Sequence, residues 1–129
     1  MFKYIKTIHS HTTAEISRHT VQNHMDIPTG TLCQISNGYL IHVESATKPY
    51  YLVVEKKLSE DGKRALDCIR LLPGMVLTVT FDPEESSFSA GMLCSFTTDS
   101  NEHCTTITTG GTTAEVVDVD GNIATIIIN

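Results

Sequence analysis

The side chains best suited to catalysis or metal binding are six histidines and four cysteines. Four of the histidines lie within the first 26 residues: His9, His11, His19 and His24. On an extended segment, His9 and His11 point to the same side, so a third nearby histidine would complete a set of imidazole ligands for a transition metal. The simpler interpretation is a group of exposed histidines that titrate near neutral pH. We therefore predict no metal ligand among them.

The four cysteines, Cys33, Cys68, Cys94 and Cys104, form no Cys-x-x-Cys pair. A structural zinc site needs two close pairs of ligands, and only Cys94 and Cys104 with His103 approach that pattern. The first residues lack the apolar core of a signal peptide. We therefore expect a chain that stays inside a cell, with free and buried thiols.

Carboxylates gather around Asp82 and between Asp118 and Asp120. The second group matches the first positions of a calcium-binding loop but lacks its final glutamate, and a β-hairpin explains it more simply. Nucleophilic catalysis needs a serine or cysteine with a base and an orienting group, and no Gly-x-Ser-x-Gly motif is present. An enzyme site built from His42 and Glu44 stays an alternative. We predict no catalytic, cofactor-binding or metal-binding residue.

The 129 residues carry a formal net charge of −6, and the nine basic residues are scattered. No cationic surface for nucleic-acid phosphates is therefore expected. The aromatic residues are spaced like core and cross-strand positions rather than a platform for stacking bases: Tyr39, Tyr50, Tyr51, Phe81 and Phe96. No apolar run approaches the roughly 20 residues of a membrane-spanning helix. We expect one globular domain that binds neither nucleic acid nor membrane.

The segments that position these residues are predicted to be short β-strands joined by turns. The strongest signal lies at 114–129, where two β-rich runs flank Asp120-Gly121, a pair typical of a type I′ hairpin turn. Asn37-Gly38 is a second pair of this kind. Further strands are predicted at 31–35, 39–43, 65–71, 91–96 and 105–108.

Two of the predicted strands differ in how their apolar residues are arranged. Residues 76–81 alternate, with Leu77, Val79 and Phe81 on one side and threonines on the other. Residues 50–55 are apolar on both faces, which is typical of a central strand covered on both sides. In total the pattern predicts about nine short strands, as in an antiparallel β-barrel or β-sandwich.

The N-terminal segment differs from the rest of the chain. Residues 1–26 hold few large apolar side chains, too few for an amphipathic helix. We predict an extended N-terminal arm here, weakly structured when alone, in which Tyr4, Ile5 and Ile8 suit a short edge strand. A β-barrel or β-sandwich domain follows at 27–129. Such an arm can order on a partner as an added strand.

The last strand is apolar on both faces. We predict Val119, Ile123 and Ile127 on one side and Ile126 and Ile128 on the other. A strand covered on both faces at the end of a chain needs a second layer, which either this chain or a neighbouring subunit supplies. Together with the arm, this favours a component of an assembly.

The order of these features resembles that of the small all-β decoration (cement) proteins of tailed-phage capsids and of related prophage structural proteins. The resemblance covers 27–128 and rests on four stretches after the arm: Ile27-Pro28-Thr29-Gly30-Thr31-Leu32, Pro73-Gly74-Met75, Gly91-Met92-Leu93 and Ala114-Glu115-Val116-Val117. It implies an oligomer, often a trimer, that binds the outside of the expanded shell. It also implies that residues 1–26 grip that shell.

We therefore expect a non-enzymatic bacteriophage or prophage virion protein, assembled in the host cytoplasm, that stabilises a capsid by binding between shell subunits. Its partner would be the major capsid protein or another virion protein, and it would form a homo-oligomer. Two alternatives stay open. One is another phage head, tail-fibre or host-interaction β domain, and the other is a small β-barrel hydrolase or isomerase. No cofactor is expected.

Overall fold

The computed structural model describes residues 1–8, 14–21, 26–44, 48–58, 64–99 and 102–129. His9, His11 and His24 lie outside the described residues. None of the described residues forms a helix long and apolar enough to cross a membrane. Their regular structure consists of strands: β1 (Phe2–Thr7), β2 (Ile16–Thr20), β3 (Leu32–Ser36), β4 (Tyr39–His42), β5 (Tyr51–Leu58), β6 (Arg64–Arg70), β7 (Met75–Thr80), β8 (Leu93–Thr98), β9 (Cys104–Thr109), β10 (Ala114–Asp120) and β11 (Ile123–Ile128).

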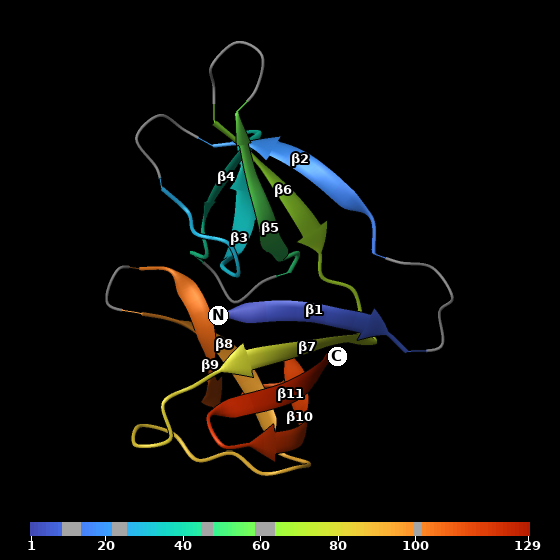
Figure 1. The fold of residues 1–129 in the computed structure, drawn as a ribbon, viewed down its shortest axis with the longest axis vertical. Coiled ribbons are helices and arrows are strands. Elements are labelled where there is room, and N and C mark those ends of the chain that lie inside the picture. The colour runs from blue at the N-terminus through green and yellow to red at the C-terminus, as the bar shows by residue number, and fades with distance from the viewer. Residues whose placement is uncertain (9–13, 22–25, 45–47, 59–63, 100–101) are drawn as a thin grey trace.

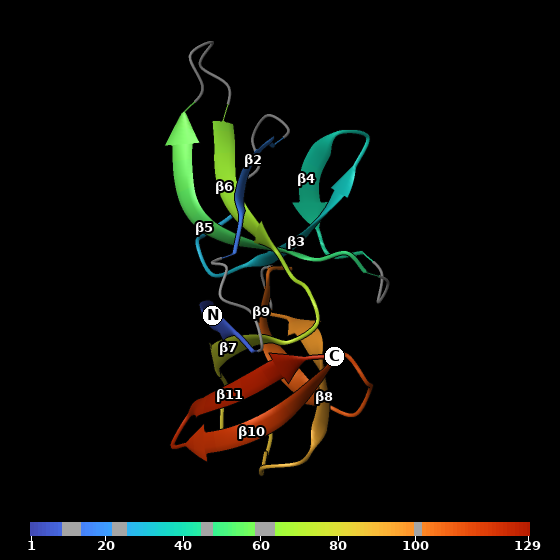
Figure 2. The same ribbon diagram turned by 90° about the vertical axis from the view of Figure 1, so that its right-hand side faces the viewer.

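The strands pair antiparallel and join into one eleven-stranded sheet. Its order is β1-β7-β11-β10-β8-β9-β3-β5-β6-β2, and β4 pairs with β3 outside this path. Figures 1 and 2 show the sheet bent into two lobes, with β2 to β6 in one and β1 with β7 to β11 in the other. The predicted all-β class is confirmed. Within the described residues the sheet is an open path that does not close into a barrel.

The buried apolar residues form two clusters, and the larger one extends from β7 to β11 into β3, β5 and β6 of the other lobe. The larger core includes Leu77, Val79 and Ile126, all of which are buried. The smaller core consists of Val21, Ile27, Cys33, Leu40, Val53, Leu66 and Cys68. Strand β5 serves both cores, because Leu52 packs in the larger and Val53 in the smaller. The prediction of a central strand covered on both faces is therefore confirmed.

The two predicted hairpins are present, but one of the turns is displaced. At Asn37-Gly38 both residues have positive φ, 51° and 82°, as a type I′ turn requires. In the C-terminal hairpin Asp120 pairs with Ile123, so the two turn residues are Gly121 and Asn122. Only Gly121 has positive φ, at 60°, which is the type II′ pattern. The prediction of a type I′ turn centred on Asp120-Gly121 was wrong by one residue.

The segment predicted as an arm contributes two strands to the sheet. Strand β1 pairs with β7, with Lys3 opposite Thr78, and β2 pairs with β6, with Arg18 opposite Asp67. These are the two end strands of the sheet, so partners distant in sequence supply most of their contacts. Phe2, only 4 % exposed, anchors β1 in the larger core. These strands account for the difference between eleven strands and the about nine predicted.

The faces of the last hairpin differ from the prediction at one residue. Val119 pairs with Ala124, and paired residues point to the same side of a sheet. Val119 therefore lies on the inner side, against the larger core, and not with Ile123 and Ile127. The register shifts between Val116 and Asp118, which changes the side to which the following residues point.

Gly30 joins β1 to β5 and thereby connects the two lobes. Its N–H donates to the carbonyl of Val53 at 2.8 Å, and its carbonyl accepts from the N–H of Phe2 at 2.9 Å. Its φ is +84°, and a Cβ there would lie 3.0 Å from the Cβ of Met1 and 3.1 Å from the carbonyl oxygen of Phe2. Only glycine fits this junction without strain.

We predict that Gly30→Ala lowers the free energy of unfolding by about 2–3 kcal/mol, because positive φ and steric contact add. The matched control is Gly38→Ala, at φ +82° with nothing within 4 Å of the added Cβ, which should cost only about 1 kcal/mol. Urea unfolding of both variants measures the difference. Equal losses would show that the junction at Gly30 is not tight.

Candidate functional site: an apolar groove beside an open strand edge

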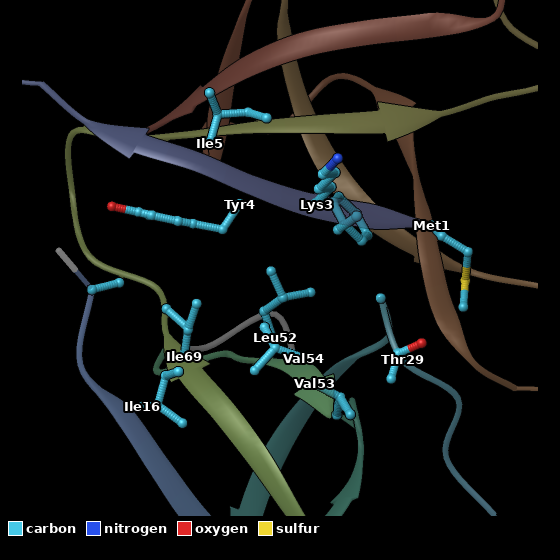
Figure 3. A pocket seen from close by; sticks show the side chains of 13 residues that line it. Met1, Lys3, Tyr4, Ile5, Ile16, Thr29, Leu52, Val53, Val54 and Ile69 are labelled. Carbon is cyan, nitrogen blue, oxygen red and sulfur yellow. The ribbon is translucent and has the colours of Figure 1, made fainter. Parts of the chain in front are cut away.

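A groove with a volume of about 790 Å³ lies between β1 and the strands β5 and β6. Figure 3 shows Tyr4 of β1 on one side and Leu52, Val54 and Ile69 across from it, with Ile16 of β2 at one end. These residues come from four strands that are far apart in sequence. The groove is therefore a product of the way the N-terminal strands are placed in the sheet.

The groove has a buried apolar floor and an exposed apolar rim. Leu52 and Ile69 are only 1 % and 7 % exposed, whereas Ile5 and Ile16 at the rim are 50 % and 63 % exposed. Exposed isoleucines beside an apolar hollow leave a patch of carbon surface in contact with water. Such patches are typical of binding sites for ligands or for other proteins.

Among the described residues, no strand pairs with the edge of β1 that faces away from β7. The N–H of Thr80 donates to the carbonyl of Met1 at 3.3 Å, which places that carbonyl on the β7 side. Because peptide groups alternate along a strand, those of Phe2 and Tyr4 point to the other side. The N–H of Phe2 donates to the carbonyl of Gly30. Beside Tyr4, no strand in the described part of the chain pairs with this edge of β1. The backbone groups of Tyr4 are therefore available to an added strand.

The far wall of the groove is fixed by an ion pair between β2 and β6. Nε of Arg18 lies 3.0 Å from Oδ1 of Asp67, whose side chain is only 10 % exposed. A charge this well buried is stabilised by a partner, so the pair holds β2 against β6 beside Ile16. Within β1, the hydroxyls of Tyr4 and Thr7 are 2.8 Å apart.

The described histidines have structural neighbours. On β2, Nε2 of His19 lies 2.7 Å from the hydroxyl of Ser17, and its ring packs against Tyr51 with 5.2 Å between centroids. Burial lowers the pKa of His19, so the ring is neutral near pH 7. The rings of His42 and His103 are 5.3 Å apart.

The residues of the alternative enzyme site are not brought into the groove. The N–H of Glu44 donates to Oε1 of Gln34 at 3.0 Å, and the side chain of Glu44 is exposed. Nε2 of His103, next to His42, lies 3.2 Å from the carbonyl oxygen of Asp26. Nδ1 of His42 is buried and has no hydrogen-bond partner among the described residues.

The carboxylates considered as calcium ligands fall at two separate places. Oδ1 of Asp82 accepts the N–H of Glu84 at 2.9 Å, and the carbonyl of Asp82 accepts the N–H of Glu85 at 3.1 Å, so these residues form a turn. Asp118 and Asp120 lie exposed on β10. Over the described ranges, no three His, Cys, Asp or Glu residues are grouped so that they hold a metal ion.

All four cysteines are buried and free, as predicted. Burial raises the pKa of Cys33, Cys68 and Cys104 to about 12. Smaller contributions come from the other two cysteines at Cys33, from Asp67 at Cys68 and from Asp99 at Cys104. Burial alone raises the pKa of Cys94 to about 11. Since the thiolate is the nucleophilic form, these thiols are packing residues at neutral pH.

The chain matches no protein-family model, and neither a curated protein nor a solved structure shows significant similarity to it.

None of the groove residues was predicted as a site from the sequence. Ile16 stands alone among polar residues and Ile5 follows Tyr4 in a short mixed segment, and neither pattern marks a rim. The sequence around the floor residues Leu52 and Ile69 predicts only buried strand positions. The groove forms when β1 is placed opposite β5 and β6, and no local pattern specifies that placement.

We predict that the native thiols of Cys33, Cys68 and Cys104 react about 10³-fold more slowly with iodoacetamide at pH 8 than the same thiols in guanidinium chloride, and that of Cys94 about 10²-fold more slowly. The reason is that a pKa of about 12, against about 8.5 for a free thiol, leaves about one thousandth of the thiolate. Mass spectrometry of the alkylated protein counts the modified residues over time. Fast modification of any one cysteine in the native protein would contradict its burial.

Proposed function

We propose that this protein is a non-enzymatic structural component of a phage or prophage virion. In this role it stabilises the capsid by binding between shell subunits, and the groove beside β1 receives a strand from its partner. The binding role is carried by one observation, the coincidence of an open strand edge with an apolar groove. The virion setting is supported by the resemblance of residues 27–128 to capsid decoration proteins.

The proposed mode of binding is addition of a β-strand. An extended segment that pairs with the peptide groups of Tyr4 satisfies its own backbone hydrogen bonds at the edge of β1. Side chains alternate along such a segment, so every second one enters the groove above Leu52 and Ile69. Each buried valine or leucine contributes about 1.5–3 kcal/mol. Two or three such side chains are enough for a specific contact.

In this proposal the N-terminal segment is the receiving edge of the contact. Strand β1 already pairs with β7, so it offers only its second edge to the partner. Ile16 then lies against the bound segment at one end of the groove, and Ile5 lies along the edge of β1 that receives it. The resemblance implies that a free arm grips the shell, and in this proposal the groove makes that contact instead.

We predict that Ile5→Asp and Ile16→Asp each weaken binding to the shell at least tenfold, because each places a carboxylate on the rim of an apolar contact. Both side chains are half exposed or more, at 50 % and 63 %, so the fold is expected to remain. The matched control is Ile35→Asp, which replaces an isoleucine that is 37 % exposed on β3, outside the groove.

The measurement is co-sedimentation with shells assembled from the major capsid protein that the same genome encodes. The wild-type protein and Ile35→Asp should pellet with the shells, and the two rim variants should stay in the supernatant. Circular dichroism verifies that each variant keeps its β structure. If the wild-type protein remains in the supernatant, the virion role is wrong. If the rim variants pellet as well as the wild type, the groove is not the contact.

A further inference from the structure

The outer face of β1, β7, β11 and β10 carries cations along one side and carboxylates along the other. Figure 1 shows these four strands side by side in the lower lobe. Their register aligns the outward side chains in rows that cross the strands. The first row is Lys6, Val76, Ile127 and Glu115, and the second row is Lys3, Thr78, Thr125 and Asp118.

The charges at the two sides of this face have no partner within the lobe. Lys3, Lys6, Glu115 and Asp118 are exposed, and no ion pair joins them to another described residue. Neighbouring strands lie about 4.8 Å apart, so three strand spacings separate lysine from carboxylate in a row by about 14 Å. That exceeds the Debye length of about 8 Å at physiological salt. The face is thus polarised, with Thr and Ile side chains between the charges.

We propose that this face binds a second copy of the chain through a twofold axis parallel to the strands. The axis lies in the plane between the two facing sheets, above the gap between β7 and β11. Rotation about it places β1 of one copy over β10 of the other. Position along the strands is kept, so Lys6 faces the partner's Glu115 and Lys3 faces the partner's Asp118. Sheets pack about 10 Å apart, a gap that lysine and glutamate side chains span together.

The charges select this orientation over the other simple twofold arrangement. An axis that crosses the strands places β1 over β1, with lysines facing lysines, and β10 over β10, with carboxylates facing carboxylates. Like charges in contact disfavour such a pairing. In the favoured orientation Thr78 meets the partner's Thr125, and the partly buried Ile127 lies over the partner's Val76, which is only 5 % exposed and adds little contact area. Symmetry repeats every contact, which gives four pairs of opposite charge.

The size of the face indicates a dimer that depends on concentration. Four strands at about 4.8 Å and five residues at about 3.3 Å span roughly 300 Å² in projection, below the roughly 800 Å² that each partner buries in a standard interface. Lys3 also lines the groove, but Lys6, Glu115 and Asp118 do not, so the variants of this test are made at Lys6 and Glu115. Self-association and strand binding are therefore tested separately.

The test is sedimentation velocity of the full chain between about 10 and 500 µM, a range chosen for a weak interface. We expect the wild type to shift from monomer to dimer, with weaker association at higher salt. Lys6→Glu and Glu115→Lys should each lower the association constant at least tenfold. The double variant Lys6→Glu with Glu115→Lys restores opposite charges and should recover most of that loss.

The matched control is Glu84→Lys, because it changes the net charge as Glu115→Lys does but lies in the turn after β7. This control should dimerise like the wild type. Several outcomes would overturn the proposal: a wild-type protein that stays monomeric throughout, one that forms trimers, or a double variant no better than the single ones. Equal losses from Glu84→Lys and Glu115→Lys would also overturn it, because net charge rather than this face would then govern association.

Discussion

The structure depends on the attachment of the first strand at two points. Along one edge β1 pairs with β7, and at its start the N–H of Phe2 donates to Gly30 in the other lobe. The side chain of Phe2 packs edge-on against Phe96, with 5.3 Å between ring centroids, and Tyr50 meets the same ring at 5.1 Å. Backbone hydrogen bonds and an aromatic cluster thus fix β1 where the two lobes meet.

The groove and the polarised face both follow from this attachment. Because β7 occupies one edge of β1, the other edge stays open beside Leu52 and Ile69. Because β1 lies next to β7, its lysines form the cationic side of a sheet face that ends in the carboxylates of β10. A single strand therefore supplies the backbone edge of one contact surface and the charges of another. The two proposed contacts, with a partner strand and with a second copy, are both built on these surfaces.

Much of the fold could be predicted from local patterns. The alternation of Leu77 and Val79 with threonines gave the correct inner face of β7, and the Asn37-Gly38 pair gave a correct hairpin turn. The turn near Gly121 was misplaced because both Asp-Gly and Gly-Asn are turn-forming pairs. The observed register pairs Asp120 with Ile123 and Val119 with the buried Ala124.

The features that matter for binding were harder to predict. Tyr4, Ile5 and Ile8 indicated a short edge strand, and β1 is one. No short-range pattern indicated β2, or gave the partners β7 and β6, which lie some fifty or more residues away. The same long-range pairing creates the groove. The thiols were interpreted correctly as packing residues, because that depends only on apolar neighbours in the sequence.

The most direct measurement of the central claim is amide hydrogen exchange along β1, followed by NMR. Because peptide groups alternate along β1, the N–H of Lys3 points to β7 and the N–H of Tyr4 points to the open edge. The N–H of Phe2 donates to the carbonyl of Gly30. The account predicts slow exchange at Phe2 and Lys3 and fast exchange at Tyr4. Uniformly fast exchange at all three residues would show a free arm, and slow exchange at Tyr4 would show that the edge is already closed.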